Sequence, residues 1–82
     1  MTKQKFNKIV KELKIMSKNS GYYGSVKVEE GETRALVEYR TKEMILETAK
    51  ENKYLHGAII NCDNYSIKVE NNELVFVFGF EW

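Results

Sequence analysis

Three residues of types used in nucleophilic catalysis, His56, Cys62 and Asp63, lie close together in the sequence. Such catalysis requires a nucleophile beside an oriented base. No recognisable motif surrounds these residues, and closeness in sequence does not place the imidazole against the thiol. We therefore interpret Cys62 as a small, partly buried residue and His56 as a helix-end residue whose charge suits the helix dipole.

Other chemical sites find no support in the residue types present. A structural zinc site needs several converging ligands, but the chain has one histidine and one cysteine. Gly21 and Gly24 lie between a predicted helix and a predicted strand, which is the wrong order for a phosphate-binding loop. The sequence thus predicts a protein that is not an enzyme and has no metal or cofactor.

The length of 82 residues predicts a single domain with a small core. A single cysteine excludes an internal disulfide framework, which fits a reducing compartment, so we expect a cytoplasmic protein. No apolar run approaches the roughly 20 residues needed to span a bilayer. The first residues also lack the apolar core of a secretory signal, so we expect no membrane partner.

Lysines are concentrated at the start of the chain. The net charge is only +1, yet residues 1–21 contain six lysines against one acid, Glu12, which gives them a charge of +5. Two interpretations remain open at this point. The lysines form either the solvated face of a helix or a surface that meets something acidic.

The first 40 residues predict a helix followed by a hairpin. Thr2 is the expected N-cap and Gly21 the expected stop. The apolar stripe of this helix consists of Phe6, Ile9, Val10, Leu13 and Met16. Residues 22–40 predict two strands that turn at Glu30-Gly31, since glycine supplies the positive φ of hairpin turns. This turn would place Val26 opposite Ala35.

A second helix is expected over residues 42–55. Thr41 is its predicted N-cap, and Gly57 is the predicted stop. Residues 58–60 would then return toward the sheet, and residues 61–64 have the composition of a loop.

The last nine residues, Leu74 to Trp82, predict a central strand. Side chains alternate between the two faces of a strand, so the aromatic rings share one face while Val75, Val77, Gly79 and Glu81 share the other. A turn at Asn71-Asn72 pairs this strand with the preceding one. The predicted pairs are Val69 with Leu74, Ile67 with Phe76, and Tyr65 with Phe78.

Residues 25–32 and 66–73 resemble each other at five of eight positions with an offset of 41 residues. This predicts a duplicated helix–strand–strand unit, with residues 1–40 as the first copy and 41–82 as the second. The alternative is that two hairpins with alternating valine and lysine look alike by chance. Either way we expect an α+β two-layer sandwich: a four-stranded antiparallel sheet of order 1-2-4-3, with both helices on one face.

The uncovered face of this sheet is the predicted functional surface. It would present an aliphatic centre ringed by basic groups, which is typical of a partner-binding surface. We therefore predict a small intracellular protein–protein interaction module, such as an inhibitor, an immunity-type protein or a mobile-element accessory protein, that docks on a larger target. The residues expected to contact the partner are Tyr23, Lys27, Arg34, Leu36, Lys68, Val75 and Val77.

The alternative function is nucleic-acid binding, by the basic uncovered face or by the lysine-rich first helix. The residues of that helix expected to meet phosphates are Lys3, Lys8, Lys11, Lys14 and Lys18. The near-neutral overall charge and the acids interleaved with the bases argue against it. A homodimer through the uncovered face or an exposed edge strand is compatible with either function.

Overall fold

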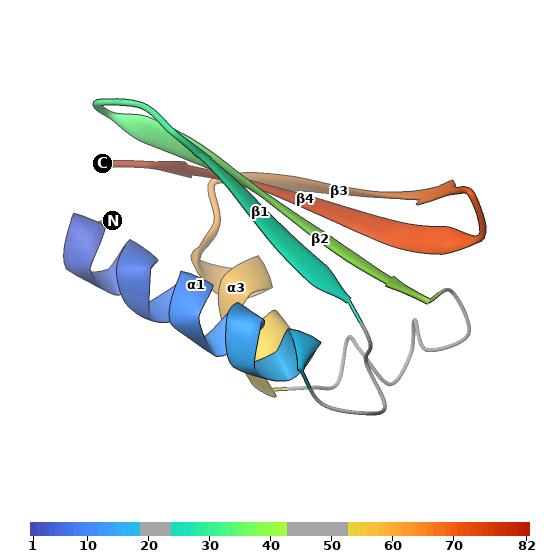
Figure 1. The fold of residues 1–82 in the computed structure, drawn as a ribbon. Helices are drawn as coiled ribbons and strands as arrows, with labels where there is room; N and C mark the ends of the chain where they lie inside the picture. The colour runs from blue at the N-terminus through green and yellow to red at the C-terminus, as the bar shows by residue number, and fades with distance from the viewer. Residues whose placement is uncertain (19–23, 43–52) are drawn as a thin grey trace.

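Four antiparallel strands form one sheet, and two helices lie against one of its faces in the part of the chain that the structure describes (Figure 1). This computed structural model describes residues 1–18, 24–42 and 53–82. The elements are α1 (Lys3–Ser17), β1 (Ser25–Glu30), β2 (Arg34–Lys42), α3 (Lys53–Asn61), β3 (Asn64–Glu70) and β4 (Glu73–Glu81). The sheet order is β1-β2-β4-β3. The predicted two-layer α+β architecture and strand order are confirmed. No helix within the described residues is long and apolar enough to cross a membrane.

Helix α1 forms as its apolar spacing predicts. The Thr2 hydroxyl caps its first turn by accepting a hydrogen bond from the Lys5 amide at 3.2 Å. Four residues of the predicted stripe are buried against the sheet: Phe6, Ile9, Leu13 and Met16. Lys3 stands at the positive end of the helix dipole, which is unfavourable, but its ammonium group lies 3.2 Å from a Glu30 carboxylate oxygen. The predicted helix end at residues 19–21 lies outside the described residues.

Strand β4 supplies the centre of the core. Phe76, Phe78 and Phe80 point toward the helices and have no exposed surface. The Asn71-Asn72 turn is confirmed, with φ angles of 53° and 64°. The predicted pairs of the second hairpin are confirmed as well, including Ile67 with Phe76 and Tyr65 with Phe78. The alternation of side chains along the last strand therefore predicts correctly which face of the sheet packs against the helices and which face does not.

The predicted turn of the first hairpin is wrong. Glu30 pairs with Ala35, and the Gly31 amide donates to the Arg34 carbonyl at 2.7 Å. The turn therefore lies at residues 32–33, and no described glycine has a positive φ. The loop is held from outside the hairpin, since the Trp82 amide donates to the Thr33 carbonyl and the Trp82 indole to the Glu32 carbonyl, both at 2.9 Å. Relative to the prediction, the register moves by an even number of residues, so every side chain keeps its predicted face.

The prediction for the region after the first hairpin also needs correction. Thr41 is not an N-cap: it lies in β2, fully buried, opposite Leu74 of β4. Gly57 does not end a helix, and residues 58–60 do not return to the sheet, because both lie inside α3. Glycine within a helix costs about 1 kcal/mol, and burial of Leu55 and Ala58 on either side of it offsets that cost. Residues 43–52, which make up most of the predicted second helix, lie outside the described residues.

The two similar segments of the sequence form the two edges of the sheet. Val26 of β1 and Ile67 of β3 both face the helices, while Lys27 and Lys68 both lie on the opposite face. The connections that follow differ, since three residues, 31–33, join β1 to β2, whereas two, 71 and 72, join β3 to β4. Duplication of a helix–strand–strand unit stays a prediction.

Candidate functional site: the open face of the sheet

The face of the sheet that points away from α1 and α3 is called the open face here. Pairing across the strands arranges its side chains in rows. From β1 through β2 and β4 to β3, one row reads Glu29, Leu36, Gly79 and Asn64. The next row reads Lys27, Glu38, Val77 and Ser66, and the third reads Ser25, Arg40, Val75 and Lys68. This grid divides the open face into two halves with different properties.

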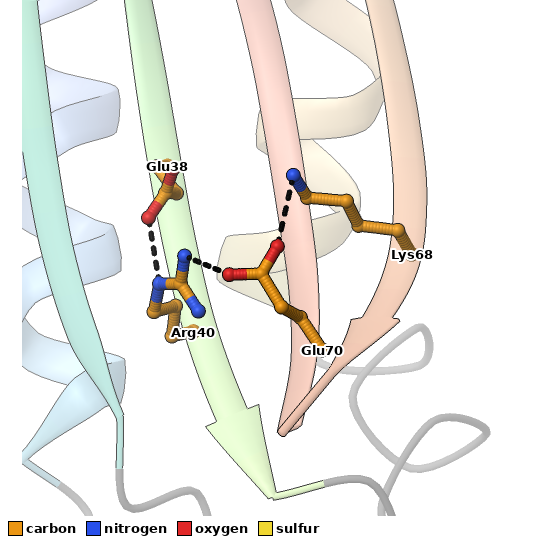
Figure 2. Close-up of polar contacts among 4 residues, drawn as sticks. All are labelled: Glu38, Arg40, Lys68 and Glu70. Atoms are coloured by element: carbon orange, nitrogen blue, oxygen red, sulfur yellow. Dashed lines mark hydrogen bonds and ion pairs between the residues drawn. The ribbon is translucent and has the colours of Figure 1, made fainter. Parts of the chain in front are cut away.

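A network of charged side chains covers the half around Val75 (Figure 2). Arg40 of β2 donates from Nη2 to Glu70 of β3 at 2.9 Å, and this contact spans the intervening strand β4. Arg40 Nε also donates to Glu38 at 2.7 Å, and Lys68 Nζ lies 3.2 Å from the other Glu70 oxygen. Val75, which the register places between Arg40 and Lys68, has no exposed surface. The prediction that Val75 is an exposed docking residue is therefore wrong.

The charges in this network neutralise one another. The Arg40 guanidinium, followed by Lys68, holds the pKa of Glu70 below its ordinary value by hydrogen bonding to the ionised carboxylate. Hydrogen bonds to Glu70 and Glu38 likewise raise the pKa of Arg40. Two acids and two bases leave no net charge, so Lys68 belongs to a paired cluster rather than to a free basic rim.

The other half of the open face is hollowed around Leu36. Gly79 has no side chain, and the surface is depressed between Leu36 on β2 and Asn64 on β3, giving a hollow of about 500 Å³. A Cβ atom at Gly79 would lie 2.6 Å from Asn64 Oδ1, so glycine leaves room for that amide. Leu36 is 48% exposed. A smaller depression of about 70 Å³ adjoins the first and exposes part of Val77 beside Leu36.

Charges of both signs surround this hollow. Lys27 and Arg34 are basic, whereas Glu29, Glu38 and Glu81 are acidic, and all five line one of the two depressions. The prediction that basic groups surround the aliphatic centre is thus wrong, because acidic groups surround it as well. The acids lie among the bases because the open face of β1 carries both Lys27 and Glu29, and that of β2 carries both Arg34 and Glu38.

Of the predicted partner-binding residues, Arg34 and Leu36 line the hollow. Lys27 and Val77 line the smaller depression that adjoins it at Leu36. Lys68 and Val75 lie in the covered half, and Tyr23 lies outside the described residues. The prediction missed Gly79 and Asn64, which shape the hollow, and Arg40, which covers Val75. Strand parity places Arg40 beside Leu36 and Glu38, so that signal was present in the sequence.

The lysines proposed for nucleic-acid contact divide into two groups. Lys3 pairs with Glu30 and lies 5.5 Å from the centre of the Trp82 ring. Lys11, Lys14 and Lys18 instead line one groove between α1 and β1, together with the apolar Val10, Ile15 and Val28. Lys8 is exposed but does not line this groove. Among the described residues, Lys8, Lys11, Lys14 and Lys18 make no ion pair.

The structure separates the roles of the histidine and the cysteine. His56 lies within α3 and is exposed, so the helix-end assignment is wrong. Cys62 is partly buried, as predicted, and its thiol donates to the Ile59 carbonyl at 3.1 Å. Burial raises the pKa of the Cys62 thiol, which disfavours the reactive thiolate.

Functional interpretation depends on this surface geometry and charge. The hollow is lined by the exposed Leu36, by the Asn64 amide beside Gly79 and by charged side chains of both signs. The half around Val75 is instead covered by ion pairs. In the comparisons with known proteins, no family model matches the chain, and no curated protein or solved structure matches it.

Proposed function

We propose that this protein is a non-enzymatic interaction module that docks on another protein through the hollow around Leu36. In this proposal it works in the cytoplasm as an inhibitor or accessory protein of a larger target. The observation that carries the proposal is a half-exposed leucine, Leu36, that lies opposite Gly79 and beside Val77 on a paired sheet. Such a residue gains apolar contact when a partner covers it, without any rearrangement of the strands.

The charges around the hollow support a protein partner rather than a phosphate backbone. Acids and bases alternate at its rim, which favours a partner with complementary charges of both signs. A nucleic acid would instead require uncompensated cations, because each phosphate contact needs a positive group. Glu29, Glu38 and Glu81 would repel such a backbone.

Leu36 supplies an energetic anchor of moderate size. Full burial of a leucine contributes about 1.5–3 kcal/mol, and 48% of this side chain is still exposed. Covering it would therefore contribute roughly 1 kcal/mol by the same scale. Placing a carboxylate there would remove that gain and introduce a charge that the partner must desolvate.

A pair of charge variants tests the proposal. Leu36→Glu changes the hollow, and Ile60→Glu makes the same kind of change on α3, where the native side chain is 64% exposed. Tagged wild type and both variants are used to capture proteins from a lysate of the source cells, with quantification by mass spectrometry. We expect the proteins retained by wild type and Ile60→Glu to be lost with Leu36→Glu. Equal recovery of the same proteins by all three chains would contradict docking through the hollow.

The groove beside α1 favours nucleic-acid binding as a second candidate function. Lys11, Lys14 and Lys18 are exposed on one side of the helix with no ion-pair partner among the described residues. Fluorescence anisotropy with labelled duplex DNA and single-stranded RNA at two salt concentrations tests this function. Binding that weakens with salt and is lost in Lys11→Glu/Lys14→Glu would support it. Absence of salt-sensitive binding at low salt would eliminate it.

A further inference from the structure

Strand β3 forms an edge of the sheet that carries exposed apolar side chains. Val69 is 64% exposed and Tyr65 45%, although both lie on the face that the helices share. Val69 lies next to the turn of the β3–β4 hairpin, and Figure 1 shows that this end of the hairpin extends beyond α1 and α3. Among the described elements, β3 packs extensively only on β4. Edge strands of monomeric proteins usually carry lysines, a proline, a bulge or inward-pointing charges. The one lysine of β3, Lys68, is paired with Glu70, the chain has no proline, and β3 pairs with β4 without a bulge.

The backbone of β3 offers hydrogen-bonding groups on its outer side. The Asn71-Asn72 turn makes Glu70 and Glu73 a hydrogen-bonded pair, since a β-turn joins its first carbonyl to its fourth amide. Pairs alternate along an antiparallel ladder, so Tyr65, Ile67 and Val69 direct their amide and carbonyl groups away from β4. These same three residues carry the apolar side chains of the strand.

We propose that two copies of this chain associate through β3, antiparallel, about a two-fold axis at Ile67. In this register Ile67 faces Ile67 of the second copy, and Tyr65 faces Val69 of the second copy. Each pair exchanges both of its main-chain hydrogen bonds, and the exposed Tyr65 and Val69 side chains cover each other. Lys68 then faces Ser66 of the second copy, so no like charges stand directly opposite.

Neighbouring registers are less favourable. A shift that centres the axis on Lys68 places the two lysines face to face, which is destabilising. A shift that centres it on Ser66 leaves Val69 opposite Asp63, a residue that precedes the strand. The register centred on Ile67 avoids both of these conflicts.

The other edge of the sheet is less suited to a second copy. Val26 and Val28 of β1 are already half-buried, and α1 packs beside them. Lys11, Lys14 and Lys18 line the groove at this edge. Two copies joined there would bring two stripes of unpaired lysines together, whereas Lys68 beside β3 is paired with Glu70.

The proposed dimer has a defined shape. Antiparallel edge pairing keeps corresponding faces on the same side, so the helices of both copies lie below one continuous sheet. The two open faces then merge on the other side and present two Leu36 hollows in one surface. The proposal does not depend on the function assigned to those hollows.

Sedimentation equilibrium tests the association, using full-length protein at concentrations up to about 1 mM, where even millimolar affinity populates a dimer. We expect wild type to approach twice the 9.6 kDa mass of one chain. Val69→Lys places a charge against Tyr65 of the second copy, and Val69→Pro removes an outward amide; both should remain monomeric. Ile60→Lys on α3 is the matched control, since Ile60 is also 64% exposed, and it should dimerise like wild type. Circular dichroism confirms that each variant folds.

Disulfide trapping tests the register. In a Cys62→Ser background, Tyr65→Cys and Val69→Cys chains are prepared separately, mixed and oxidised. Directly opposed residues of a hydrogen-bonded pair have Cα atoms about 5.5 Å apart, within the range for a disulfide. We expect a crosslinked heterodimer from the mixture and at least tenfold less crosslinking from either chain alone. A monomeric wild type at every concentration would overturn the proposal. So would a dimer that Val69→Lys and Val69→Pro leave intact, or equal crosslinking by the single chains.

Discussion

Phe78→Ala should come close to unfolding the domain. Phe78 has no exposed surface and lies in the central strand between Val37 of β2 and Tyr65 of β3. Its ring centre is 6.2 Å from that of Phe76 and 6.4 Å from that of Phe80. Strands on both sides fix the backbone around it, so the cavity left by alanine has little means of collapsing. Such truncations cost about 3–5 kcal/mol.

This loss is large beside the total stability of a small domain, which typically starts at about 5 kcal/mol. For a domain of this size each kcal/mol lowers the melting temperature by about 4–8 °C, so we expect a decrease of at least about 12 °C. Circular dichroism during heating and urea unfolding measures it. Leu36→Ala on the open face is the control and should cost about 1 kcal/mol or less, since the side chain is half exposed. A Phe78→Ala melt within about 5 °C of wild type would refute the assignment of this ring to the core.

Three further predictions concern ionisation and the second turn. Arg40 and Lys68 lower the pKa of Glu70, so the stabilisation that this carboxylate provides is present above its unfolded pKa and is lost as pH falls through the lower folded value. At pH 7 the free energy of unfolding in urea should be larger for wild type than for Glu70→Gln. This difference should shrink as the pH falls below 4.5, the ordinary pKa of a glutamate. A difference that does not change with pH would disprove the linkage. The partly buried Cys62 thiol has a raised pKa, so alkylation by iodoacetamide at pH 8 should be slower than for a cysteine peptide, and an equal rate would count against this. Asn72 has a φ of 64°, so Asn72→Gly should stabilise the hairpin by about 0.5–1 kcal/mol in urea unfolding, whereas a lower stability would contradict the turn geometry.

The sequence allowed the fold to be predicted where local pattern and tertiary structure agree. The β3–β4 hairpin combines strict alternation with a turn whose two asparagines tolerate positive φ, and its register was predicted correctly. The turn of the first hairpin was predicted wrongly because Trp82, about 50 residues away in the sequence, holds the loop after β1 by two hydrogen bonds. Local turn chemistry at Glu30-Gly31 carries no information about that contact.

The sequence predicts which face of the sheet carries the candidate site, but not which residues of that face are exposed. Strand parity placed Leu36 and Val77 on the open face, which the structure confirms. Whether Val75 is exposed depends on Arg40 reaching Glu70 across β4. That contact requires the order of strands and the register between hairpins, both of which are long-range properties. The hollow at Gly79 has the same origin, since Leu36 and Asn64 become its neighbours only when the sheet assembles.

Site-specific photocrosslinking in the source cells tests the central claim most directly. A benzoylphenylalanine residue replaces Leu36 of the open face in one chain and Ile15 of α1, which has a similar exposure, in another. After irradiation, mass spectrometry identifies the proteins joined to each chain. The proposed docking surface predicts a discrete protein adduct at position 36 that is absent at position 15. No adduct at position 36, or the same adducts at both positions, would contradict it.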